Sequence, residues 1–214
     1  MLDEAGNLRQ EGVDFYLGIL DWLNVNGIKP FVTLYHWDLP QHLEEQGGWL
    51  DRETAFRFQE YVDLITRTFG DRVYSYATLN EPFCSAYLGY ETGIHAPGIV
   101  GAQSGKQAGH HLLLAHGLAM QALRENAPKS LNGIVLNITP TYAASSSVTD
   151  IKAAKLADAM LNQWFFSPVL TGEYPQAFDA LPDNVFPDIK EGDMAIISQP
   201  NDYIGINYYT REIY

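Results

Sequence analysis

The sequence has one cysteine, Cys84, among its 214 residues. No disulfide can therefore form within the chain. A lone thiol suits a reducing compartment, where disulfides are rare. The opening residues also lack the basic start and the apolar run of a secretory signal. These observations lead us to expect a cytoplasmic protein.

Basic residues are scarce as well. Lysine and arginine together number 13, against 26 aspartates and glutamates, so the formal net charge is −13. An excess of negative charge repels polyanions, which argues against nucleic acid and against an acidic membrane surface as partners. No apolar run approaches the length that a membrane span requires. We therefore expect neither a nucleic-acid partner nor a membrane partner.

Nucleotide-binding loops are also missing. Neither a Gly-x-Gly-x-x-Gly turn after a strand nor a P-loop occurs, so a dinucleotide or nucleotide fold loses its main support. The remaining composition is that of a globular protein with a sizeable core, at 46% hydrophobic and 13% aromatic residues. Aromatic rings suit the flat faces of sugars, but large cores use them too, so composition alone does not select a function.

Apolar residues recur at spacings of three and four in several segments, and short β-branched or aromatic runs lie between these segments. Strands that alternate with helices predict a parallel sheet covered by helices. No linker interrupts the pattern, which predicts a single domain over residues 1–214. The expected helices are 11–26, 51–69, 105–126 and 150–166; the expected strands are 31–35, 73–79, 133–137 and 203–206; the expected irregular segments are 41–50, 83–104 and 167–190.

The segment VYSYATLNEPF, residues 73–83, carries the strongest chemical signal. It begins as a strand and must stop near Pro82, because proline cannot donate to a strand ladder. Pro82 also biases Glu81 towards extended backbone angles. Glu81 is thus presented at the carboxyl end of a strand with Asn80 beside it. In a (β/α) barrel that end carries the chemistry. The plain alternative is a solvated glutamate in a turn.

Polar and aromatic residues follow all four expected strands. Because the carboxyl ends of parallel strands meet at one rim of a barrel, these side chains are expected to converge on one pocket. One carboxyl group, several neutral hydrogen-bonding groups and aromatic rings suit a polyhydroxylated ligand. The residues at the four strand ends are His36 with Trp37, Asn80 with Glu81, Asn137, and Asn207 with Tyr209.

Glycoside hydrolysis normally needs two carboxyl groups, one as acid and one as nucleophile or base. Glu81 fits the role of the general acid, and Asn80 is placed to hold a sugar hydroxyl.

Four motifs together closely resemble glycoside hydrolase family 1, the β-glucosidase family. They are Tyr-His-Trp-Asp-Leu-Pro at 35–40, Thr-Leu-Asn-Glu-Pro-Phe at 78–83, Gly-Ile-His-Ala-Pro-Gly at 93–98 and Gly-Ile-Asn-Tyr-Tyr at 205–209. The resemblance implies an α/β fold of the (β/α)8 TIM-barrel type and a retaining mechanism that acts on terminal β-D-glucosides, without metal or other cofactor. It implies that Glu81 is the catalytic acid/base.

The resemblance also assigns the sugar-binding residues. It implies that five residues surround the sugar, with Tyr209 near the nucleophile: His36, Trp37, Asn80, Asn207 and Tyr209. Phe83 and Asn137 match positions on the aglycone side.

The family chain is about twice as long as this one. A TIM barrel takes roughly 250 residues, and the resemblance covers only strands three to six with their helices. The family's nucleophile motif, Thr-Glu-Asn-Gly, would lie beyond Tyr214. We interpret the chain as an internal fragment, a partial barrel that is inactive or weakly active alone. The nearest candidates by sequence for a replacement nucleophile are Asp38 and Glu91.

Two other hypotheses remain. In the first, the chain is a non-catalytic half-barrel whose open edges pair with a second copy or with a complementary barrel half. In the second, it belongs to another family of barrel hydrolases that also carries Asn-Glu-Pro on its fourth strand. The motif at 35–40 argues against this second hypothesis. His110, His111 and His116 lack the i, i+4 spacing of a helical metal site, and we expect them to be packing or surface residues.

Overall fold

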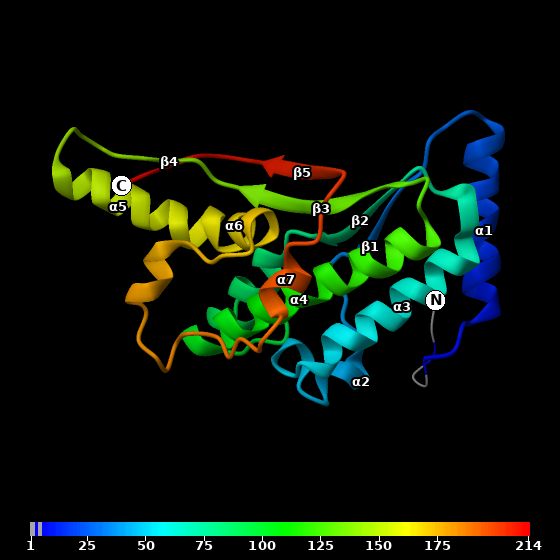
Figure 1. The fold of residues 1–214 in the computed structure, drawn as a ribbon, viewed down its shortest axis with the longest axis horizontal. Coiled ribbons are helices and arrows are strands. Elements are labelled where there is room, and N and C mark those ends of the chain that lie inside the picture. Colours follow the sequence, from blue (N-terminus) through cyan, green and yellow to red (C-terminus); the bar gives the residue numbers. More distant parts are fainter. Residues whose placement is uncertain (1–2, 4–5) are drawn as a thin grey trace.

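A parallel four-stranded sheet organises the molecule (Figure 1). The computed structural model describes residue 3 and residues 6–214. The strands stand in the order β1-β2-β3-β5, and every neighbouring pair is parallel, so all four carboxyl ends lie at one edge. They are β1 (Phe31–Tyr35), β2 (Ser75–Asn80), β3 (Leu131–Ile138) and β5 (Tyr203–Tyr208).

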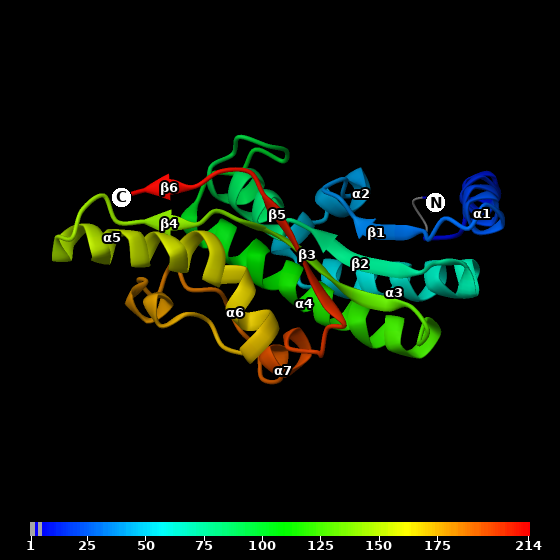
Figure 2. The same ribbon diagram turned by 90° about the horizontal axis from the view of Figure 1, so that it is seen from above.

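Helices connect the strands and cover one face of the sheet, with α3 and α4 beneath it and α1 standing at the β1 side (Figures 1 and 2). A short parallel pair, β4 (Thr141–Tyr142) and β6 (Glu212–Ile213), continues beyond β3 and β5. The α-helices are α1 (Gln10–Val25), α2 (Gln41–Glu44), α3 (Glu53–Phe69), α4 (Ala102–Asn126), α5 (Val148–Asp158), α6 (Trp164–Thr171) and α7 (Asp193–Ile197).

Short 3-10 and π turns fill most of the connections. The 3-10 turns are η1 (Gly48–Leu50), η2 (Gly70–Arg72) and η5 (Gln176–Ala180), and the π segments are η3 (Cys84–Glu91) and η4 (Ala159–Gln163).

The core lies between the sheet and the helices α3 and α4. The apolar stripe predicted for the segment 51–69 is buried on α3, and each such side chain contributes roughly 1.5–3 kcal/mol when fully buried. Asp51, two residues before the helix begins, accepts a hydrogen bond from the backbone N–H of Glu53 at 2.9 Å. The stripe consists of Ala55, Phe58, Val62, Ile65 and Phe69.

Helix α4 departs from its predicted single apolar face. Leu112, Leu113 and Leu114 are consecutive, yet all three are fully buried. Polar side chains of this helix are buried as well, among them Gln107, His110 and His116. Here α4 contacts β2, β3, α3, α6, α7 and η3, so it is the central helix of the molecule.

Two segments predicted to be irregular are partly helical. Within 83–104, residues Cys84–Glu91 form the π segment η3, whose wide turn leaves no 3.6-residue apolar period to detect in the sequence. The helix expected to end at 166 continues through η4 and α6 to Thr171. Pro168 removes one helical donor, but Trp164 and Val169 on either side are buried and hold the segment in place.

Apolar side chains are exposed along both outer edges of the sheet. At the β1 edge Phe15, Trp22 and Phe31 are each more than 60% exposed, and at the β5 edge Ile206 and Tyr208 are about as open. Apolar side chains are therefore open to solvent beside both edge strands of the four-stranded sheet. None of the described helices is both long and apolar enough to cross a membrane.

Candidate active site

Glu81 lies directly after β2, at the carboxyl edge of the sheet, and is buried. Its backbone N–H donates to the carbonyl oxygen of Val135 on the neighbouring strand at 2.8 Å. The extended angles expected for Glu81 from Pro82 are wrong: its φ of 46° falls in the left-handed region, which a non-glycine residue adopts only when the surrounding structure holds it there. The β2–β3 register shifts between Ala77 and Asn80, which turns the end of β2 at this point.

The carboxyl group of Glu81 is bound by two residues from the end of β5. Asn207 Nδ2 donates to Glu81 Oε1 at 2.7 Å, and the Tyr209 hydroxyl donates to the same oxygen at 3.0 Å. Asn207 Nδ2 also lies 3.1 Å from Asn80 Oδ1. The proximity of the Glu81 carboxylate raises the pKa of Tyr209, so this hydroxyl keeps its proton and acts as a donor.

The end of β1 reaches the same group of residues. Asn80 Nδ2 donates to His36 Nε2 at 3.3 Å, and Trp37 Nε1 donates to the backbone oxygen of Asn80 at 2.9 Å. The Trp37 ring lies edge-on to His36 and 5.8 Å from the ring of His95, in the loop after η3. Trp37 itself has a φ of 81°.

The structure thus brings all six predicted site residues into one hydrogen-bonded group at one edge of the sheet. Asn137 and Phe83 lie outside it. Asn137 stands opposite Asn207 in the β3–β5 register, whereas Phe83 stacks on Tyr87 at 4.8 Å and packs against the core. The individual roles of the six residues stay predictions.

Cys84 adjoins the predicted site in the sequence, where it is expected to be a small buried apolar residue, and it also contacts Glu81. Its Sγ lies 3.4 Å from Glu81 Oε2. Burial, the hydrogen bond to Glu81 and the charge of that carboxylate raise the pKa of Cys84 to about 12. The thiol is therefore protonated near neutral pH.

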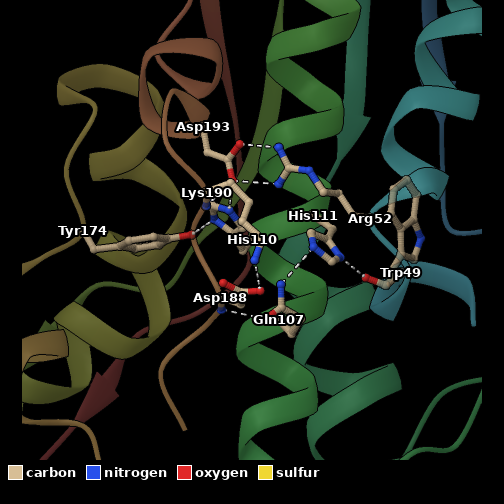
Figure 3. Close-up of polar contacts among 9 residues, drawn as sticks. All are labelled: Trp49, Arg52, Gln107, His110, His111, Tyr174, Asp188, Lys190 and Asp193. Carbon is tan, nitrogen blue, oxygen red and sulfur yellow. Dashed lines mark hydrogen bonds and ion pairs between the residues drawn. The ribbon is translucent and has the colours of Figure 1, made fainter. Parts of the chain in front are cut away.

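A second polar group lies behind the sheet, between α3, α4 and α7 (Figure 3). Asp193 is fully buried. Its carboxylate accepts hydrogen bonds from Arg52 Nη1 at 2.7 Å and from His110 Nε2 at 2.9 Å. Burial opposes its charge, but the hydrogen bonds from Arg52, His110 and the backbone N–H of Lys190 hold the pKa of Asp193 below its usual range. Tyr174 contacts the other nitrogen of His110 at 3.0 Å.

This buried group connects to β1 through the neighbouring histidine. His111 Nε2 accepts a hydrogen bond from Gln107 Nε2 at 2.9 Å, and His111 Nδ1 donates to the Trp49 carbonyl at 2.9 Å (Figure 3). Trp49 Nε1 in turn donates to the hydroxyl of Tyr35, the last residue of β1, at 3.0 Å. The histidines expected to be packing or surface residues are therefore buried hydrogen-bonding residues, and one of them, His111, connects through Trp49 to the strand before His36.

Burial also governs the protonation of these histidines. It lowers the pKa of His111 to about 4 and that of His116 to about 3, and it lowers the pKa of His110. Within the described part of the chain, no group of three or more His, Cys, Asp or Glu side chains is arranged to hold a metal ion.

Solved structures identify the class of fold. A family 1 β-glucosidase from Thermotoga maritima superposes with a TM-score of 0.91 at 39% identity and covers 96% of this chain and 46% of its own. The AHE enzyme from Alicyclobacillus herbarius also superposes at 0.91, at 44% identity, covering 97% of this chain and 48% of its own. The predicted partial (β/α)8 barrel is confirmed.

The sequence profile of glycosyl hydrolase family 1 matches residues 3–214, and this chain belongs to that family. A β-glucosidase of an Agrobacterium strain is 43% identical over 209 residues, which are 97% of this chain and 45% of that protein. The chain thus spans about half the length of the curated relatives it matches.

Proposed function

We propose that residues 1–214 supply the acid/base half of a retaining β-glucosidase that acts on terminal β-D-glucosides. One observation carries this proposal: the buried carboxyl group of Glu81 lies at the carboxyl edge of the parallel sheet and is bound by Asn207 and Tyr209. These residues come from strands that are far apart in the sequence. Glycoside hydrolysis in a barrel requires a carboxyl group at the carboxyl edge of the sheet, held in place by residues from other strands.

In this mechanism Glu81 gives its proton to the leaving glycosidic oxygen while a second carboxylate bonds to the sugar carbon. The leaving oxygen keeps the electron pair of the broken bond. Glu81, now ionised, then takes a proton from the water that releases the sugar. Asn80 and His36 are placed to bind sugar hydroxyls, and the Trp37 ring offers an apolar face.

The second carboxylate comes from outside residues 1–214. Glu91 is bound to Lys106 at 2.6 Å, and Asp38 lines a cleft beside Leu39 and Tyr61. Glu81 is not among the residues that line the cleft at Asp38, and the carboxylate of Glu91 is neutralised by its ion pair with Lys106. We therefore propose that the chain alone hydrolyses glucosides weakly or not at all.

Glu81→Gln tests the proposal in a full-length barrel that contains this segment. The amide keeps the shape of the side chain but cannot give up a proton. We expect kcat/KM to fall by about a hundredfold or more for an alkyl β-glucoside, and far less for a dinitrophenyl β-glucoside, whose leaving group needs no proton. Equal activity of both forms on the alkyl glucoside would overturn the assignment.

The exposed edges support a second proposal, that this single domain is completed by a complementary barrel half. Phe31 and Trp22 at one edge, and Ile206 and Tyr208 at the other, are open to solvent beside unpaired strands. A complementary half would cover both edges at once. Sedimentation of the chain alone tests this: we expect self-association that the complementary half reverses. A well-folded monomer with a cooperative melt would contradict it.

A cytoplasmic location is also a proposal, supported by the single thiol in the sequence.

A further inference from the structure

The two oxygens of the Glu81 carboxyl group have unequal surroundings. Oε1 receives two donors of full strength, Asn207 Nδ2 at 2.7 Å and the Tyr209 hydroxyl at 3.0 Å. Oε2 is contacted by the Cys84 thiol at 3.4 Å. A thiol is a weak donor compared with an amide or a hydroxyl. The carboxyl group is therefore firmly held at one oxygen and lightly held at the other.

Local backbone structure places the thiol at this oxygen. The chain becomes helical at Pro82, and the backbone N–H of Cys84 donates to the carbonyl oxygen of Glu81 at 2.9 Å. This bond closes a turn that directs side chains three residues apart to the same side. The position of Sγ relative to Oε2 therefore follows from the same turn that ends β2.

The thiol acts as a donor and not as a nucleophile. Burial and the neighbouring carboxylate raise the pKa of Cys84 to about 12, so at pH 7 almost every molecule carries S–H. The sulfur–oxygen distance of 3.4 Å suits a hydrogen bond in which sulfur is the donor. Cys84 is also only partly exposed, which restricts access by external reagents.

We propose that Cys84 is a positioning residue for Glu81, which keeps Oε2 free to exchange its proton with the glycosidic oxygen. This inference rests on the acid/base role proposed above. Asn207 donates to Oε1, so the proton is carried on Oε2. It passes to the leaving oxygen as that oxygen takes the electron pair of the broken bond. The S–H contact orients Oε2 until the substrate oxygen takes its place, and Cys84 keeps its own proton throughout.

The kinetic test compares Cys84→Ala with Cys84→Ser in a full-length barrel. Loss of one hydrogen bond that orients the acid corresponds to about a tenfold change in rate. We expect Cys84→Ala to lower kcat/KM by about that factor for an alkyl β-glucoside and to leave kcat/KM for a dinitrophenyl β-glucoside nearly unchanged. We expect Cys84→Ser to recover most of the loss on the alkyl substrate. Equal losses on both substrates, or no loss on either, would overturn the proposal.

A second test does not depend on turnover. If Cys84 contacts Glu81, removing the carboxylate charge must lower the pKa of the thiol. We expect Glu81→Gln to increase the rate of iodoacetamide alkylation of Cys84 at pH 8 by about tenfold or more, since one pKa unit is a tenfold change in thiolate. Glu45→Gln removes an exposed carboxylate elsewhere and serves as the matched control. An unchanged rate in Glu81→Gln would refute the contact.

The two tests separate the inference from the function on which it rests. If Glu81→Gln hydrolyses the alkyl glucoside normally, the proposed function fails. If Glu81→Gln is inactive on that substrate but the Cys84 variants behave like the parent, only the role of Cys84 fails.

Discussion

The indole of Trp37 donates from Nε1 to the backbone oxygen of Asn80 at 2.9 Å, and so ties the end of β1 to the end of β2. The donor residue has an unusual backbone angle, with φ 81° at Trp37, and so does Glu81, which follows the acceptor residue and has a φ of 46°. Each such angle costs on the order of 1–3 kcal/mol in a non-glycine residue and persists only where other contacts fix it. The Trp37 bond is one of these contacts.

Trp37→Phe removes this donor and keeps an aromatic ring. The Asn80 oxygen then loses its partner, and we expect unfolding to become easier by about 1–2 kcal/mol. We also expect kcat/KM on a β-glucoside to fall, because the turn that presents Glu81 is less well fixed. Denaturant unfolding and steady-state kinetics of a full-length barrel measure both effects.

The buried ion pair of Arg52 and Asp193 gives a prediction about stability. Arg52→Met leaves the Asp193 carboxylate without its main partner in a buried position, which typically costs about 3–5 kcal/mol (Figure 3). Urea unfolding measures the change. Lys129→Met breaks an exposed pair with Asp71 and should cost less than about 1 kcal/mol. Similar small effects of both substitutions would show that the Arg52 pair does not stabilise the fold.

Burial of His116 predicts how stability depends on pH. Its pKa is about 3 when folded, and an unfolded histidine has a pKa near 6.5. Below pH 6.5 the unfolded chain gains a proton that the folded chain cannot bind. The stability due to neutral His116 is therefore complete above that pH and falls by about 1.4 kcal/mol per pH unit down to the folded pKa.

His116→Gln removes this titration and retains a polar side chain near Thr78. Between pH 6 and 4 we expect the free energy of unfolding of the variant to fall less steeply, by about 1.4 kcal/mol per pH unit. Parallel slopes for His116→Gln and the parent protein would contradict the assigned protonation state.

Much of the fold could be predicted because its signals are local. The strand that leads to Glu81 is readable from its β-branched and aromatic residues and from Pro82, and the stripe on α3 from its spacing. The π segment η3 was missed because its wide turn leaves no helical period. The pairing of Arg52 with Asp193 joins positions 141 residues apart and has no local signal. Cys84 was interpreted as a small buried residue, since its contact with Glu81 depends on that unrecognised turn.

The central claim is that Glu81 is the acid/base of a retaining site. Its most direct test is the product that Glu81→Ala forms from dinitrophenyl β-glucoside in the presence of azide, in a full-length barrel. Without a general base the glycosyl intermediate accumulates, and a small anion that needs no base can release it. The account predicts faster turnover with azide and a β-glucosyl azide product. Formation of glucose alone, at a rate that azide does not change, would contradict it.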